Sequence, residues 1–265
     1  MKRYIRNNSI SAGIRPDTDG HYVFDYTYNL PSDIIHIQPP QLYKSIEGNN
    51  VYWFGYMFND DVSSKDRTSF INYLKGIGDD KISASDLKHL IELPLDELNN
   101  NINLYHIDCF VYPLSNRSEL VSTMVKTINR WTSREMDRLS FELVKSAPKD
   151  IGFDWKSFSS DYERDPLRYK QMSKYIEDKL LPKIHQLDYF SLAHNVKPKY
   201  RPYIQNFLKM SESDIEILSR LQGDNILVVD DINTSGSTIQ EIIRIISSVN
   251  SNCNIYIYTL IGNVK

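Results

Sequence analysis

The segment ILVVDDINTSGSTIQEII, residues 226–243, combines residue types that suit ligand binding at the end of a strand. Its first four residues are apolar and predict a buried strand. Asp230 and Asp231 follow at the carboxyl end of that strand. Two adjacent carboxylates are costly there unless they bind something, such as sugar hydroxyls, metal-bound water or backbone N–H groups. The pair therefore indicates acceptors for a polyhydroxyl ligand.

A loop of small polar residues, NTSGST at 233–238, follows the acid pair. Gly236 lets the backbone turn and approach a ligand closely. We expect a helix over Ile239–Val249, and Thr238 and Glu241 have the spacing of a capping box at its start. Unpaired N–H groups at a helix start, together with hydroxyls, favour an anion. A tight turn capped by a hydroxyl is the simpler interpretation, but the full combination favours a sugar phosphate.

The stretch VVDDINTSGST, Val228–Thr238, resembles the phosphoribosyl-pyrophosphate (PRPP) binding motif of the type I phosphoribosyltransferases. That motif is an apolar strand, two acids, an apolar and a variable residue, Thr, Thr or Ser, Gly, a variable residue and Thr. Every specified position matches. The resemblance implies that Asp230 and Asp231 are catalytic residues that hold the ribose 2′ and 3′ hydroxyls. It also implies that the loop cradles the 5′-phosphate through Thr234, Ser235, Gly236, Ser237 and Thr238.

The resemblance further implies a transferase that displaces pyrophosphate from C1 of the ribose. Its cofactor is Mg²⁺, which is expected to bind through PRPP rather than through protein ligands. The acceptor is not identified. Asn233 stands where 6-oxopurine members of the family commonly carry an aspartate base, and an amide cannot accept a proton. Asn233 therefore argues against that substrate class.

Two other functions fit the same motif. A non-catalytic PRPP- or nucleotide-binding regulatory module needs the same acid pair and phosphate loop. An accessory protein that uses the fold for a nonstandard reaction also fits, because the first hundred residues have no counterpart in the family.

A second loop, Pro113–Ser118, follows a predicted strand and precedes a predicted helix. The resemblance places a pyrophosphate-binding loop at this point. Four residues carry hydroxyl, amide or guanidinium donors that suit a diphosphate: Ser115, Asn116, Arg117 and Ser118. A polar cap for the following helix is the competing interpretation.

The elements that would position these loops alternate along residues 101–265. Strands are expected at His106–Tyr112, Ser140–Lys145, Leu187–Ala193, Asn225–Val229 and Ile255–Ile261. Helices are expected at Ser118–Trp131, Tyr169–Leu181, Ser213–Leu221 and Ile239–Val249. Such alternation predicts an α/β fold, with a parallel sheet, helices on both faces and ligands at the carboxyl ends of the strands. This is compatible with a phosphoribosyltransferase-like core.

Residues 1–100 look different and predict an N-terminal α+β accessory region. Strands are expected at His21–Tyr28 and Val51–Phe58, helices at Ser64–Ile77 and Ala84–Leu93, and a break at Asn99–Asn101. We therefore divide the chain into 1–100 and 101–265. By position, the first part is a candidate hood over the acceptor site. Its aromatic residues, such as Tyr52, Trp53 and Tyr56, either stack on a base or, as the simpler interpretation has it, build a second small core.

Two basic segments offer further anion-binding candidates. Residues 145–186 occupy the place of the family's mobile catalytic loop, but their positive charges are offset by acids, so a solvated helix face is the favoured interpretation. The cluster KPKYR, with Lys197, Lys199 and Arg201, is interleaved with tyrosines and suits phosphates or nucleic acid. Plain surface is again the simpler interpretation.

Composition limits the classes of partner. The chain of 265 residues is 41% hydrophobic and 25% charged, with a formal net charge of −3, which is ordinary for a globular protein and gives no global field for nucleic acid. No apolar run is long enough to span a bilayer, and the first residues lack the apolar stretch of a signal peptide. Two cysteines in apolar runs suit a reducing cytoplasm. We expect a cytoplasmic protein whose partner is PRPP or another ribose 5-phosphate ligand, without membrane or nucleic acid, and a homodimer is compatible with this.

Overall fold

The computed structural model describes residues 13–16, 22–25, 35–38, 42–44, 51–58, 63–77, 82–115, 118–132, 138–233 and 236–262. Within these residues, ten strands form one mixed sheet in the order β10-β7-β6-β11-β12-β5-β3-β1-β2, with β4 also paired to β5. The strands are β1 (Gly13–Pro16), β2 (Tyr22–Asp25), β3 (Ile35–Gln38), β4 (Leu42–Lys44), β5 (Val51–Phe58), β6 (Cys109–Pro113), β7 (Leu139–Lys145), β10 (Leu208–Lys209), β11 (Asn225–Asn233) and β12 (Asn254–Gly262). From β7 to β5 all neighbours are parallel, which confirms the predicted α/β fold with a mostly parallel central sheet.

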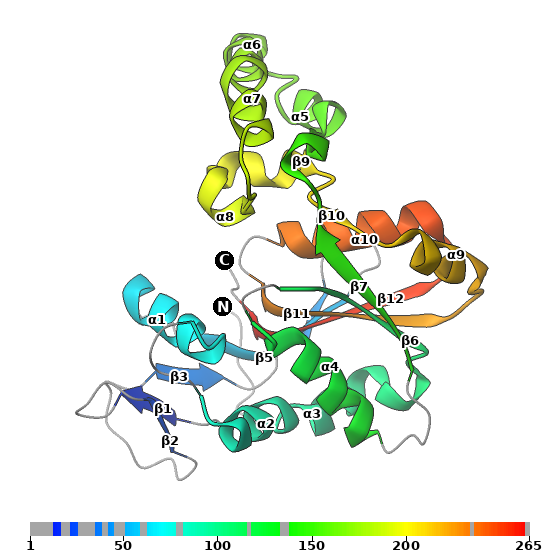
Figure 1. Cartoon of the computed structure of the whole chain (residues 1–265). Coiled ribbons are helices and arrows are strands. Elements are labelled where there is room, and N and C mark those ends of the chain that lie inside the picture. Colours follow the sequence, from blue (N-terminus) through cyan, green and yellow to red (C-terminus); the bar gives the residue numbers. More distant parts are fainter. Residues whose placement is uncertain are drawn as a thin grey trace.

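Helices cover both faces of the sheet (Figure 1). On one face lie α1 (Ser64–Leu74), α2 (Ala84–Glu92), α3 (Leu95–Ile102) and α4 (Leu120–Trp131), and on the other lie α9 (Glu212–Arg220) and α10 (Ser237–Val249). Most of these bounds agree closely with the expected helices. None of the helices in the described part of the chain is long and apolar enough to cross a membrane.

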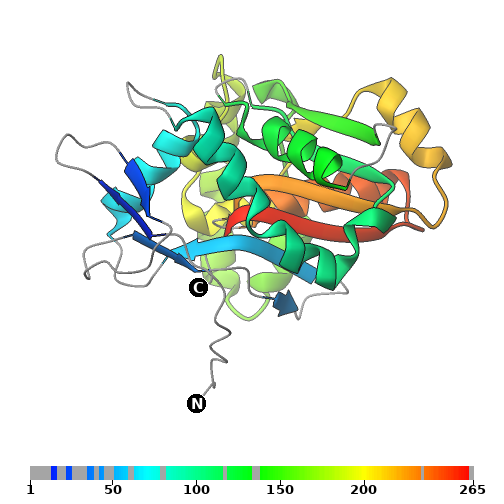
Figure 2. The same ribbon diagram turned by 90° about the horizontal axis from the view of Figure 1, so that it is seen from below.

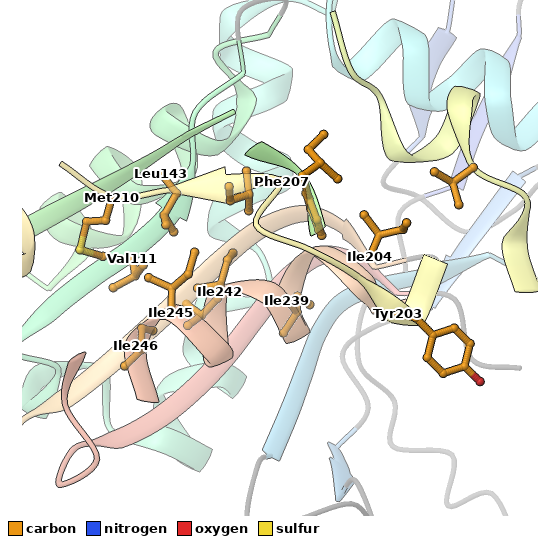
Figure 3. Packing of buried hydrophobic residues seen from close by; sticks show 14 of the residues in the cluster. Val111, Leu143, Tyr203, Ile204, Phe207, Met210, Ile239, Ile242, Ile245 and Ile246 are labelled. Carbon is orange, nitrogen blue, oxygen red and sulfur yellow. The ribbon is translucent and has the colours of Figure 1, made fainter. Parts of the chain in front are cut away.

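Helix α10 illustrates how the apolar period of the sequence builds the core. Its buried apolar residues are Ile239, Ile242, Ile245 and Ile246, which recur at helical spacing on one face. Figure 3 shows these side chains against Val111 of β6 and Leu143 of β7. The same face packs α10 on the sheet shortly after β11, which carries the acid pair and ends two residues beyond it at Asn233.

The chain leaves β6 and β11 in opposite directions. β6 continues through α4 to β7, whereas β11 continues through α10 to β12, and the two helices lie on opposite faces of the sheet. Because β6 and β11 are parallel neighbours, the loops that follow them diverge at the same edge. Crevices of this kind, at the carboxyl ends of strands where the strand order reverses, are the usual ligand sites of open α/β sheets.

A helical excursion, residues 152–205, lies between β7 and β10 and rises above the sheet in Figure 1. Its two ends are joined by a short antiparallel pair of strands, β8 (Gly152–Phe153) and β9 (Ile204–Gln205). Between them lie α5 (Trp155–Asp161), α6 (Pro166–Tyr175), a π-helical turn at Ile176–Leu180, α7 (Leu181–His185) and α8 (Leu192–Asn195). Three rings, Phe153, Phe158 and Tyr203, pack with centroids 5.1–5.7 Å apart and form its centre.

Two details of the excursion differ from expectation. The helix expected at Tyr169–Leu181 continues to His185 through the π-helical turn. We attribute that turn to Pro182, which lacks a backbone N–H and would clash with the preceding turn of a regular helix. The strand expected at Leu187–Ala193 was wrong, because this segment is an irregular bend followed by the start of α8. Arg201 donates hydrogen bonds to the carbonyl of Ala193 in α8 and to that of Val196, the residue after the helix.

The N-terminal part of the chain shares the sheet and the core. The strand predicted at Val51–Phe58 is β5, which pairs in parallel with β12 (Figure 2, blue beside red). The break predicted at Asn99–Asn101 was wrong: these residues lie in α3, which ends at Ile102 and has Asn103, with φ +48°, as its C-cap. The division near residue 100 therefore falls inside a helix and is not a gap in packing, although an accessory role for residues 1–100 stays a prediction.

Leu98 tests whether the chain near residue 100 is packed in the core. It lies beside Asn99 in α3 and is fully buried, whereas Leu167 in α6 is 69% exposed. Leu98→Ala should lower the free energy of unfolding by about 2–5 kcal/mol, since it leaves a cavity. The matched Leu167→Ala should change it by less than about 0.5 kcal/mol. Denaturant titration compares the two, and equal small effects would place residue 98 outside the core.

Candidate functional site

The acid pair lies where β11 reaches the carboxyl edge of the sheet. Asp230 and Asp231 are only 6% and 9% exposed. Because successive residues of a strand point to opposite faces, Asp230 lies on the side of Val228 and α10, and Asp231 on the side of Val229 and α1. The pair therefore presents one carboxyl group to each side of the strand end.

The two carboxyl groups differ in their partners. The Asp231 backbone N–H donates to Asp230 Oδ1 at 2.9 Å, and Asp231 Oδ2 lies 2.8 Å from the ammonium Nζ of Lys75. Burial, and secondly the charge of Asp231, raise the pKa of Asp230 to about 8, against the opposing effects of that hydrogen bond and Lys75. The raised pKa means that the folded chain favours the uncharged form of the Asp230 carboxyl.

A small pocket opens between Asp230 and the start of α10. It is open to solvent and is lined by Asp230, Ile232, Asn233, Gly236, Ser237, Thr238 and Ile239. Gly236 has φ +72°, which glycine adopts without strain, and it immediately precedes the first helical residue. The pocket thus brings together the predicted acid Asp230 and the predicted loop residues 236–238. Thr234 and Ser235 lie outside the described residues.

The predicted capping box at Thr238 and Glu241 was wrong. The helix begins two residues earlier than that pattern requires, with Gly236 as the N-cap and no side chain capping it. Glu241 is instead buried and accepts from Nε of Arg244 at 2.8 Å and from its Nη2 at 2.9 Å. Arg244 also donates to Asn206 at 2.9 Å, so this ion pair joins α10 to the base of the excursion. Because Glu241 is engaged there, its carboxylate does not cap the first N–H groups of α10, which belong to residues that line the pocket.

The second predicted loop follows β6 at the same edge of the sheet. Val111 of β6 lies opposite Val228 of β11, so Ser115 follows the strand beside the acid pair. Ser118 Oγ accepts from the backbone N–H of Leu120 at 3.2 Å and so supports the start of α4, as the competing interpretation has it. Asn116 and Arg117 lie outside the described residues. That this loop binds diphosphate stays a prediction.

Sequence reasoning missed Lys75. It follows α1 in the N-terminal part of the chain and reaches the acid pair only through the fold. Nothing local distinguishes it from other lysines, apart from Gly76, which marks the end of a helix. The contact shows that residues before 100 contribute to the site.

The aromatic residues singled out in the N-terminal part are core residues. Trp53 and Tyr56 are 4% and 2% exposed and pack between the sheet and α1–α3. Tyr56 donates to the Leu90 carbonyl at 2.8 Å, and Tyr52 accepts from Gln240 Nε2 of α10 at 2.7 Å. These rings are therefore packing residues, but the expected second small core was wrong: Tyr52 lies in the core on the α10 face of the sheet, and Trp53 and Tyr56 lie in the core on the opposite face, both shared with later parts of the chain.

The basic segments also take structural roles. The lysines and arginines of the helices in 164–183 are exposed, as a solvated face predicts. In the cluster KPKYR, Arg201 binds backbone carbonyls, and the ammonium groups of Lys197 and Lys199 lie 6.0 and 4.8 Å from the ring centres of Tyr175 and Tyr200.

No model of a protein family and no curated protein matches this sequence. Among solved structures, a hypoxanthine phosphoribosyltransferase from Staphylococcus aureus is similar to part of the chain. Its tetragonal crystal form aligns at 11% identity and a TM-score of 0.33, covering 68% of this chain and 64% of that chain. Its orthorhombic form gives 12% identity, the same TM-score, and 68% and 65% coverage. This chain thus spans less than two thirds of that protein, and a likeness of this size bears on neither substrate nor activity.

The raised pKa of Asp230 predicts how stability depends on pH. A carboxyl whose pKa is higher in the folded than in the unfolded chain stabilises the fold at low pH, and this stabilisation is lost between about pH 4 and pH 8. Asp230→Asn should flatten the slope over this range. One pKa unit corresponds to about 1.4 kcal/mol, so near pH 8 the variant should gain on the order of a few kcal/mol.

Denaturant titrations at several pH values measure this slope. The control is Asp224→Asn, just before β11 at the opposite end of the strand, which should leave the slope in place. A flat wild-type profile would show that Asp230 is already ionised in the folded protein.

Proposed function

We propose that this protein binds PRPP, or another ribose 5-phosphate ligand, at the acid pair and the adjoining pocket. On this proposal it is a phosphoribosyltransferase-like enzyme that transfers the phosphoribosyl group to an acceptor with release of pyrophosphate. The observation that supports it is that buried Asp230 and the start of α10 line one pocket, with buried Asp231 next to Asp230 in the strand, where the strand order reverses. The motif Val228–Thr238 adds the resemblance in sequence.

Each side of the site matches one part of the ligand. Carboxylate oxygens of Asp230 and Asp231 accept hydrogen bonds from two neighbouring ribose hydroxyls. The backbone N–H groups of Ser237 and Thr238, at the positive end of the α10 dipole, donate to the 5′-phosphate. Thr234 and Ser235 complete this loop on the strength of the sequence.

The donor set also bears on Mg²⁺. Within the described residues, no group of three or more His, Cys, Asp or Glu side chains forms a metal cage. Two carboxyl groups at a ribose site fit a hard cation that keeps water and takes ligand phosphate oxygens. Such a cation, when bound, stabilises the charge of departing pyrophosphate. The chain's own residues hold the ribose: Asp230 must give up its proton to accept from a hydroxyl, so binding near pH 7 should release protons.

A non-catalytic binding module is the second candidate. The observation that favours it is Asn233, whose side chain lines the pocket but cannot take a proton from an acceptor. Pyrophosphate release from PRPP, measured with and without a panel of nucleobases, separates the two candidates. Binding without turnover would favour the module.

The acid pair provides the main test. Asp230→Asn with Asp231→Asn should lower PRPP affinity at least about 100-fold in isothermal titration with Mg²⁺, because two charge-assisted acceptors are lost. The variant should remain folded, since it no longer buries two adjacent acids. Asp224→Asn serves as the matched control and should bind like the wild type. Unchanged affinity in the double variant would show that the acid pair does not bind the ribose.

Gly236 tests the phosphate side against a glycine of the same conformation. Gly236 and Gly223 both have φ +72°, and an added Cβ has room at each: its nearest neighbour is 3.7 Å away at Gly236, and nothing lies within 4 Å at Gly223. Either glycine changed to Ala should therefore lose about 1–2 kcal/mol of stability through backbone strain alone. Only Gly236→Ala should weaken binding of ribose 5-phosphate, by about tenfold or more. Equal binding by both variants would make the loop a structural turn.

A further inference from the structure

Lys75 has a fixed backbone position near the acid pair and a side chain that is able to move. Its N–H donates to the Ile71 carbonyl at 3.0 Å, and Gly76, with φ +63°, turns the chain immediately afterwards. Phe70 and Leu74, on the same helix, are 0% and 2% exposed and anchor α1 in the core. The Lys75 side chain, by contrast, is 26% exposed. The ammonium group can therefore move on its four-carbon stem while the helix stays in place.

The order of groups across the strand end matches the order of groups along the ligand. From one side to the other lie Lys75, Asp231, Asp230 and the pocket at α10. PRPP carries, in the same order, the C1 diphosphate, the 2-hydroxyl, the 3-hydroxyl and the 5-phosphate. With the 5-phosphate in the pocket and the hydroxyls on the acid pair, the diphosphate projects from the ring on the side of Asp231 and Lys75.

We propose that Lys75 is a diphosphate-binding residue, which pairs with Asp231 in the free protein and moves to the C1 diphosphate when the ligand binds. In the free protein the ion pair stabilises the buried Asp231 carboxylate, because Lys75 supplies a positive charge beside it. When ribose hydroxyls replace the ammonium at Asp231, the displaced charge meets a strongly anionic group within reach of its stem. This rests on the proposed function, and it gives the N-terminal part of the chain a direct role in ligand binding.

Two ligands that differ only at C1 separate this role from a structural one. Lys75→Met should lower the affinity for PRPP with Mg²⁺ by about 10–100-fold, the value of a charge-assisted hydrogen bond. Its affinity for ribose 5-phosphate should stay within about threefold of the wild type or increase, because that ligand lacks the diphosphate and no longer competes with the ammonium. Lys75→Arg should restore most of the affinity for PRPP. Lys65→Met, an exposed lysine on the same helix, is the control and should change neither affinity.

An equal loss for both ligands would show that Lys75 only maintains the site, and no loss for either would show that it does not contact the ligand. Both results overturn the proposal. If the wild type binds neither ligand, the proposed function fails and the diphosphate contact fails with it.

The resting ion pair is tested without any ligand. Lys75→Met should lower the melting temperature at pH 7 by at least about 2–4 °C, and should have no such effect in an Asp231→Asn background. Equal shifts in both backgrounds would show that Lys75 does not act through Asp231. This would overturn the proposal that Lys75 moves from Asp231 to the diphosphate, whatever the ligand measurements give.

Discussion

The arrangement of the candidate site depends on the burial of two consecutive carboxyl groups near the end of β11. Two carboxylates in adjacent positions cannot both be buried and charged at low cost. The molecule meets this in two ways: Asp231 pairs with Lys75, and Asp230 takes an elevated pKa. Both arrangements are reversible, and on the proposed function a ligand would replace the proton on Asp230 and the ammonium group at Asp231.

The position of β11 makes this constraint effective. It is a central strand with parallel neighbours on both sides, and its apolar residues 226–229 are fully buried. The acid pair is therefore held by a rigid scaffold rather than by a loop, while residues of the loop after it line the adjoining pocket. The pocket and the acid pair stay in fixed relation because α10 begins immediately after Gly236 and packs through its isoleucines on the same sheet.

Two regions far apart in the chain meet at this scaffold. The N-terminal part adds β5 to the sheet beside β12 and places Lys75 at the acid pair. The helical excursion is tied to α10 through the Arg244 link from Glu241 to Asn206. A movement of α10 would therefore displace Asn206, which lies between β9 and β10 at the base of the excursion.

The sequence by itself determined the local parts of this protein. The strand, acid pair, glycine turn and helix of residues 226–249 are consecutive, so their spacing alone brings Asp230 and Gly236 to one pocket. Amphipathic periods likewise placed β5, α1, α4 and α10 close to their observed bounds. Only the tertiary structure decided that Lys75 pairs with Asp231, that Glu241 bonds to Arg244 instead of capping its helix, and that the asparagines after Leu98 continue a helix. These outcomes depend on which side chains distant segments bring within a few ångströms, and local spacing carries no information about such contacts.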